Sequence, residues 1–116
     1  MMRVTRYAAA PAYNPPLHIG VECRRLQGHE AGPTARFWTG LSVYAPGGEA
    51  QESPTMEETI YTVLDGELTV RSGGATEILR KLDSVHLPKG TVRSVVNESG
   101  APATLLVAIA VPEPAQ

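Results

Sequence analysis

Glu58 and His86 carry the side chains that could move a proton on a small molecule. Glu58 stands just before the apolar run 59–64. A half-buried carboxylate there can have a raised pKa and act as a general base, whereas a solvated carboxylate in a turn is the alternative interpretation. His86 has the strand parity of Ser84, so it could enter a pocket as an acid or a base, or lie on a surface or in an interface.

Aromatic side chains that could wall a pocket lie on the strand-like run 36–44, RFWTGLSVY. One face of that strand would carry Phe37, Thr39, Leu41 and Val43, and the other Trp38, Gly40, Ser42 and Tyr44. The second face suits a pocket wall, or an outer face that packs on another subunit. Trp38, Tyr44 and Tyr61 could each contact an apolar or aromatic substrate or pack in the core.

The run 59–64, TIYTVL, is the central strand-like element and ends at Asp65-Gly66. The returning run 67–71 alternates polar and apolar residues, as a half-buried strand does. Asp-Gly between two such runs is a strong hairpin signal, because Gly adopts a positive φ without strain. We therefore predict a hairpin of residues 59–64 and 67–71, preceded by a Pro-Gly-Gly turn at 46–48.

The remaining patterns indicate an all-β domain. Further strands are predicted at 18–26, 36–44, 75–79, 83–87, 92–97 and 103–111. Around eight short strands, in a chain of 116 residues with 11 Gly and 10 Pro, favour a sandwich or barrel. Three prolines make residues 1–17 an irregular segment. Residues 18–112 would form the barrel domain and residues 113–116 a C-terminal tail.

Two stretches resemble the conserved motifs of the cupin superfamily. Residues 46–66 with the following ELTV are similar to the first motif, usually G-x5-H-x-H-x3,4-E-x6-G, and residues 82–97 to the second, usually G-x5-P-x-G-x2-H-x3-N. The resemblance implies a double-stranded β-helix, the jelly-roll cupin barrel. In that family the three His and the Glu bind a divalent metal inside the barrel.

The metal-ligand positions of these motifs carry other residues in this chain. Counting back from Gly66, the Glu position falls on Thr59 and the two His positions on Ser53 and Thr55; with a one-residue bulge in 59–64 they fall on Glu58, Glu52 and Pro54. In the second motif Asp83, Pro88, Gly90 and Asn97 match, Leu82 replaces the glycine, and Arg93 stands at the His position. The three histidines, His18, His29 and His86, lie outside the motif positions. We therefore expect no metal cofactor.

Arg93 would place a fixed positive charge where the resemblance implies a metal. A guanidinium has no lone pair for a metal, but its planar fork of donors suits a carboxylate, phosphate or enolate oxygen. The alternative is internal, with Arg93 paired to Glu57 or Glu58, because an unpaired buried guanidinium is unfavourable. Ser53 and Thr55 could line the mouth as hydrogen-bond donors or simply lie in a loop.

Composition limits the other partners. The net charge of −2 gives no electrostatic argument for nucleic acid or an anionic membrane. Cys23 is alone, which excludes an intrachain disulfide, and no apolar run has the length of a signal peptide or a membrane span. We expect a cytoplasmic protein and, because small cupins commonly pair, a homodimer.

These observations lead to three functional hypotheses. The first is a metal-independent cupin enzyme acting on a small organic anion, with isomerase, cyclase, lyase or decarboxylase chemistry. Arg93 would hold the anion, and Glu58 or His86 would move the proton. The second is a non-catalytic cupin that binds a small molecule as a sensor or carrier. The third is a metal-dependent oxygenase with atypical ligands.

Overall fold

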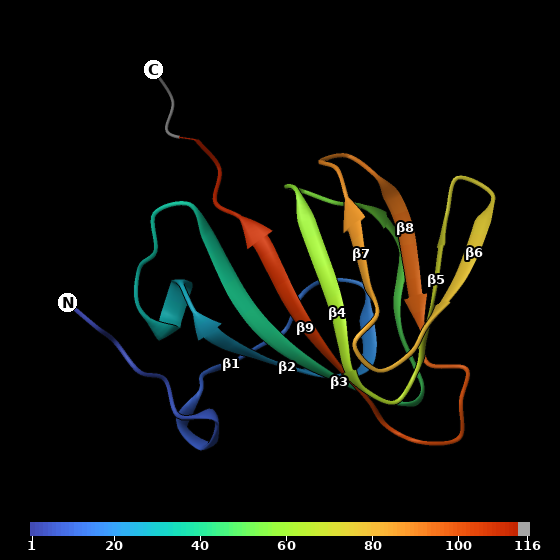
Figure 1. The fold of residues 1–116 in the computed structure, drawn as a ribbon, viewed down its shortest axis with the longest axis horizontal. Helices are drawn as coiled ribbons and strands as arrows, with labels where there is room; N and C mark the ends of the chain where they lie inside the picture. Colours follow the sequence, from blue (N-terminus) through green and yellow to red (C-terminus); the bar gives the residue numbers. More distant parts are fainter. Residues whose placement is uncertain (114–116) are drawn as a thin grey trace.

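The computed structural model describes residues 1–113 and consists of strands joined by short turns (Figure 1). The strands are β1 (Ala12–Tyr13), β2 (His18–Gln27), β3 (Phe37–Pro54), β4 (Thr59–Asp65), β5 (Leu68–Ser72), β6 (Ala75–Leu79), β7 (Ser84–Leu87), β8 (Val92–Val96) and β9 (Ala103–Ala110). The helical elements of this range are two single 3-10 turns, η1 (Tyr7–Ala9) and η2 (His29–Ala31). The all-β prediction is confirmed. No helix in residues 1–113 has the length and apolar character needed to cross a membrane.

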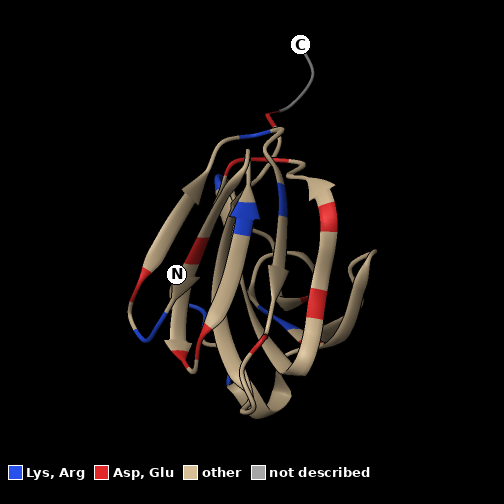
Figure 2. Ribbon diagram, turned by 90° about the vertical axis from the view of Figure 1, so that its right-hand side faces the viewer, with Lys and Arg blue, Asp and Glu red and all other residues tan. Residues whose placement is uncertain are grey.

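The strands pair in the order β6-β5-β8-β3-β9-β4-β7, with β2 on the other edge of β3 and β1 on β2, and every pairing is antiparallel. Together they form a nearly closed barrel (Figure 1). Strand β3 joins its two halves, because residues 37–44 pair with β9 and residues 49–54 pair with β8. Acidic and basic positions are interspersed over the face shown in Figure 2.

The predicted Pro-Gly-Gly turn at 46–48 is wrong, because β3 continues through it. Gly47 has a φ of +79°, and a Cβ on Gly48 would lie 2.4 Å from the carbonyl oxygen of Gly20 on β2. Strand β2 shifts register at the same place, between Ile19 and Val21. The glycines therefore bend two strands that approach closely and do not reverse the chain.

The predicted hairpin at Asp65-Gly66 is also wrong. Strand β4 pairs with β7 and β9, whereas β5 pairs with β6 and β8. The turn itself forms, with Gly66 at a φ of +77°, and a Cβ on Gly66 would lie 2.6 Å from the carbonyl oxygen of Pro102. The tight turn therefore packs on the segment that leads into β9. It connects β4 in one half of the barrel to β5 in the other half.

The interior is filled by one hydrophobic cluster: Tyr44, Ala50, Tyr61, Val63, Leu68, Val70, Leu79, Leu87, Val95, Ala103, Leu105 and Val107. Of the two predicted faces of residues 37–44, the one with Trp38 and Tyr44 is buried within the chain. The alternative of an outer face packing on another subunit is therefore wrong for these residues. Asn97 of the second motif is fully buried and ties the start of one loop to β3, because its Nδ2 donates to the Tyr44 and Ala101 carbonyl oxygens.

The N-terminal segment folds back onto the barrel. Most of residues 1–17 lie outside helices and strands, but β1 pairs with β2 through Ala12↔Arg24 and Tyr13↔Cys23. The backbone N–H of Arg25 donates a 2.8 Å hydrogen bond to the Pro11 carbonyl oxygen, which adds to that pairing. This attachment brings the next residues of the segment over the barrel interior. Of the predicted C-terminal tail, residues 114–116 lie outside the described residues.

Candidate functional site

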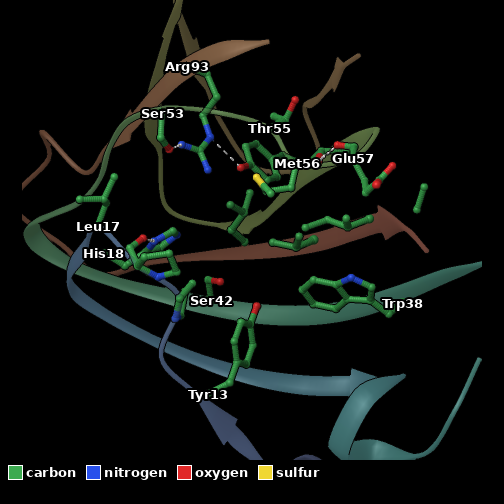
Figure 3. A pocket seen from close by; sticks show the side chains of 18 of the residues that line it. Tyr13, Leu17, His18, Trp38, Ser42, Ser53, Thr55, Met56, Glu57 and Arg93 are labelled. Atoms are coloured by element: carbon green, nitrogen blue, oxygen red, sulfur yellow. Dashed lines mark hydrogen bonds between the residues drawn. The ribbon is translucent and has the colours of Figure 1, made fainter. Parts of the chain in front are cut away.

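A pocket of about 600 Å³ opens into the barrel. That volume is typical of sites for small organic molecules. Its polar and ionisable lining residues are Tyr13, Asn14, His18, Arg25, His29, Ser42, Tyr44, Ser53, Thr55, Glu57, Thr59, Tyr61 and Arg93. They come from both halves of the barrel and from the N-terminal segment, so the fold gathers residues that are far apart in sequence (Figure 3).

Arg93 lies on β8 with 8% of its surface exposed. Its Nε donates to the Tyr61 hydroxyl at 3.0 Å, and its Nη1 to Ser53 Oγ at 3.0 Å and, more weakly, to the Gln51 carbonyl oxygen at 3.4 Å (Figure 3). None of the ion pairs found among residues 1–113 includes Arg93. The internal alternative, Arg93 paired with Glu57 or Glu58, is therefore wrong, and the partners that hold this cation are neutral.

The structure distinguishes the two motif registers. All three residues of the first register, Ser53, Thr55 and Thr59, line the pocket with Arg93, whereas of the alternative register Pro54 does and Glu52 and Glu58 do not. The threonine hydroxyls serve the backbone: Thr55 Oγ1 donates to the Pro88 carbonyl oxygen at 2.7 Å, and Thr59 Oγ1 to that of Glu57 at 2.9 Å. Ser53 instead holds Arg93.

The residues at these positions do not fit a divalent metal. Hydroxyls are weak ligands beside imidazole and carboxylate, and a guanidinium repels a cation. Within the part of the chain that the structure describes, no three His, Cys, Asp or Glu side chains are grouped to hold an ion. We therefore assign no step of the chemistry to a metal at this place.

Glu58 and His86 lie outside the pocket, so their assignment as its acid and base is wrong. His86 Nε2 donates to Glu58 Oε2 at 2.6 Å, and both side chains are more than half exposed. Strand parity explains the error. Thr59 and Tyr61 are the inward residues of β4, which leaves Glu58 facing out, and on β7 it is Leu87 that is buried while His86 is exposed.

Glu57, not Glu58, is the carboxylate on the pocket lining. Its side chain is 19% exposed, and Lys89 Nζ lies 3.6 Å from its Oε1. It belongs to the short connection between β3 and β4. Such a connection has no period that predicts direction, so the sequence could not distinguish the two adjacent glutamates.

His18 also lines the pocket, although no pattern in the sequence predicts a role for it. Its Nδ1 lies 2.8 Å from the carbonyl oxygen of Pro16. Burial lowers the pKa of His18, the hydrogen bond to Pro16 opposes that change, and the charge of Arg93 lowers the pKa further. The sequence places His18 at the start of the first predicted strand, which is the one feature that points to a fixed position for it. Nothing in the sequence shows that the preceding prolines cross the barrel mouth.

The end of the pocket around Trp38 is aromatic. Trp38 meets Tyr13 and His29 edge to face, with ring centroids 5.8 and 5.1 Å apart. The guanidinium of Arg25 lies 3.6 Å from the Tyr13 centroid and 4.5 Å from that of Trp38, and bonds Glu30 at 2.9 Å. Charge balance by Glu30 and the two rings makes Arg25 part of the wall, in contrast to Arg93.

Tyrosine hydroxyls supply neutral donors to the same space. Burial raises the pKa of Tyr44, and the nearby Tyr61 raises it further. Burial raises the pKa of Tyr13 in the same direction. Both side chains therefore stay protonated near neutral pH. The three aromatic residues predicted as pocket walls, Trp38, Tyr44 and Tyr61, all lie on the lining and are also buried.

Comparison with known proteins agrees with this architecture. The family model described as Cupin domain matches residues 40–109. A protein of Mycobacterium tuberculosis (strain ATCC 25618 / H37Rv), named beta-D-galactosidase Rv1717, is 56% identical over 111 residues, which is 96% of each chain.

Solved structures share the fold at low identity. The polyketide cyclase RemF from Streptomyces resistomycificus superimposes with a TM-score of 0.83 at 21% identity, over 99% of this chain and 83% of that one. A cupin-superfamily sugar phosphate isomerase from Silicibacter pomeroyi gives 0.68 at 24% identity, over 80% and 60% of the two chains. With the family model covering more than half of its length, this chain belongs to the cupin family.

Proposed function

We propose that this chain is a metal-independent cupin enzyme that binds a small organic molecule through an anionic oxygen and moves a proton within the pocket. The observation that carries the proposal is Arg93, a buried guanidinium on the pocket lining whose protein partners, Tyr61, Ser53 and the Gln51 carbonyl, are all neutral. A bound anion would supply the counter-charge that the described residues do not.

The electrostatics of the pocket favour an oxygen that carries or develops negative charge. A cation acts more strongly inside a barrel than in water, because the effective dielectric constant is lower. Tyr61 and Ser53 fix two guanidinium nitrogens, so no reorganisation is needed when charge develops on the ligand. Isomerisation, cyclisation, elimination and decarboxylation can each proceed through such an oxygen, as an enolate or a carboxylate. Tyr13 and Tyr44, both protonated, can donate to other ligand oxygens.

Hydrolysis of a β-D-galactoside is the second candidate, and one specific observation favours it: the 56% identical relative carries the name of that activity. Glycosidases usually use two carboxylates around an oxocarbenium-like transition state. The carboxylate on this lining is Glu57, which would serve as the acid. The charge of Arg93 opposes a developing oxocarbenium ion, so a galactoside would have to bind with its anomeric carbon away from Arg93. A sensor or carrier would use the same pocket without turnover.

Paired ligands that differ in charge test the proposal. Titration calorimetry with D-galacturonate and D-galactose compares a carboxylate with a hydroxymethyl group on the same ring. We expect the wild-type protein to prefer D-galacturonate, Arg93→Lys to weaken that binding, and Arg93→Met to weaken it more, by about ten- to a hundredfold. Equal affinity for the two sugars, or unchanged affinity in Arg93→Met, would contradict an anion site at Arg93.

Activity is measured on the same variants. Release of nitrophenol from 4-nitrophenyl β-D-galactopyranoside, lost in Glu57→Gln and retained in Glu58→Gln, would favour the second candidate. These two variants are a matched pair, because the glutamates are adjacent and only Glu57 lines the pocket. Conversion of D-galacturonate, followed by exchange of its carbon-bound hydrogens with deuterated water, would favour the first. Binding with neither reaction would identify a sensor or carrier of sugar acids.

A further inference from the structure

We propose that His18 is the residue that takes up and returns the proton in this pocket, through its Nε2 atom. The inference rests on the proposed function and adds the catalytic base to it. In the forward step Nε2 accepts a proton from an O–H or C–H bond of the ligand. The electron pair of that bond stays on the ligand as an alkoxide or enolate. The guanidinium of Arg93 stabilises the negative charge of that ligand oxygen. The reverse transfer restores the neutral imidazole.

The hydrogen bond on the other ring nitrogen fixes the tautomer. His18 Nδ1 lies 2.8 Å from the Pro16 carbonyl oxygen, and a carbonyl only accepts, so Nδ1 carries the hydrogen. In the neutral ring Nε2 then keeps its lone pair, which is the form a base needs. Such a bond also orients the ring, as the partner of a catalytic histidine does.

The surroundings keep the ring uncharged near neutral pH. Burial lowers the pKa of His18 first, and Arg93 lowers it further against the opposing effect of Pro16. The other titratable groups that share the pocket are Tyr13, Arg25, His29, Tyr44, Glu57 and Tyr61. By reciprocity, an anion that neutralises Arg93 raises the pKa of His18, so the base becomes stronger once the ligand is bound.

The backbone holds His18 from both sides. Residues 13–18 all line the pocket as one continuous segment. Within it Leu17 has a φ of +62°, and its carbonyl oxygen accepts a 2.8 Å hydrogen bond from the Gln51 nitrogen. His18 then begins β2, opposite Ala50 of β3. Figure 3 shows His18 across the cavity from Arg93.

The other two histidines are less suited to this role. His86 is exposed and its Nε2 is taken by Glu58. His29 stands in η2, against the edge of Trp38 at the aromatic end. His18, in contrast, lines the pocket with Arg93, whose charge lowers the pKa of its imidazole.

Nitrogen NMR of the ligand-free protein tests the chemical state of His18. The signals are assigned with His18→Gln, and His86→Gln serves as a control that leaves the pocket intact. We expect a proton on Nδ1, a free lone pair on Nε2, and a titration midpoint below the ordinary value of about 6.5. A proton on Nε2 in the neutral ring, or a midpoint at or above that value, would overturn the proposal without any ligand.

The pH dependence of anion binding tests the coupling to Arg93. D-galacturonate stays ionised between pH 5 and 8, so its affinity for the wild-type protein should rise about three- to tenfold as pH falls through the midpoint of His18. His18→Gln should bind with little pH dependence, and His86→Gln should match the wild type. Binding with the same pH dependence in His18→Gln would overturn the role of His18 and leave the anion site standing. No binding of D-galacturonate would count against the anion site, and the NMR result would then decide for His18.

Discussion

Replacing Arg93 by methionine should weaken anion binding by about ten- to a hundredfold and leave the stability of the fold nearly unchanged. The side chain is buried and its neutral partners are two hydroxyls and one backbone carbonyl. A methionine fills much of the same volume without a charge. The hydroxyls of Tyr61 and Ser53 remain on the pocket lining, where water can reach them.

The magnitude follows from two opposing contributions. The two 3.0 Å hydrogen bonds from a charged donor stabilise the fold by about 1.5–3 kcal/mol each. Burying a guanidinium without a carboxylate partner destabilises the fold, by roughly several kcal/mol. The sum is close to zero, so we expect the free energy of unfolding to change by no more than about 1 kcal/mol, or about 5 °C in Tm.

Urea denaturation followed by circular dichroism measures this change, and thermal shift with D-galacturonate measures the ligand effect. At about 100 times Kd a ligand should stabilise the wild-type protein by about 2.7 kcal/mol and Arg93→Met by far less. Arg71→Met is the matched control, since Arg71 is an exposed arginine that bonds Glu98 at 2.9 Å. A loss above about 3 kcal/mol in Arg93→Met, with Arg71→Met unaffected, would show that Arg93 is a structural residue.

Four further outcomes are expected. Gly66→Ala should lower Tm clearly, because its φ is +77° and its Cβ would meet backbone at 2.6 Å, whereas Gly73→Ala, with open space around it, should cost about 1 kcal/mol or less in thermal denaturation. Asn97→Ala should cost about 2–4 kcal/mol in urea denaturation, since four hydrogen bonds of a fully buried side chain are lost. Glu58→Gln and His86→Gln should each bind D-galacturonate as the wild type does, because neither residue lines the pocket, and calorimetry checks this. Sedimentation velocity at micromolar concentration should give the mass of two chains, and a mass of one chain would contradict the predicted homodimer.

Alternation of polar and apolar residues predicted the strands well. Apart from β3, each of the predicted strands ends within one residue of where the structure has it. Alternation reports which face of a strand is buried, and this holds wherever the strand lies. It does not report which strand lies beside it, so the Asp65-Gly66 turn was recognised while the pairing of β4 with β5 was not. The length of β3 was missed because Pro-Gly-Gly usually reverses a chain.

The motif positions predicted one side of the pocket and not the other. The second motif places Arg93 at a ligand position of the family, and counting back from Gly66 places Ser53 at another. Both residues line the pocket. The motif register with a one-residue bulge favours Glu58, but the short connection before β4 has no period that predicts which of the two adjacent glutamates faces the pocket. His18 and Tyr13 reach the pocket only because the N-terminal segment pairs with β2 and crosses the mouth. That approach depends on tertiary contacts, which local sequence does not encode.

A change of parity inside β3 decides the charge of the pocket. Along β3 the even-numbered residues from Trp38 to Tyr44 are buried, as are Gly48 and Ala50, whereas near the end of the strand the odd-numbered Ser53 reaches the pocket. The register with β8 shifts between Ala50 and Ser53, where an irregularity of the bulge type lies. Without that shift Glu52 would face Arg93 and complete an internal ion pair. With it, Ser53 holds the guanidinium and Glu52 is exposed, so the positive charge of Arg93 is left to act on a ligand.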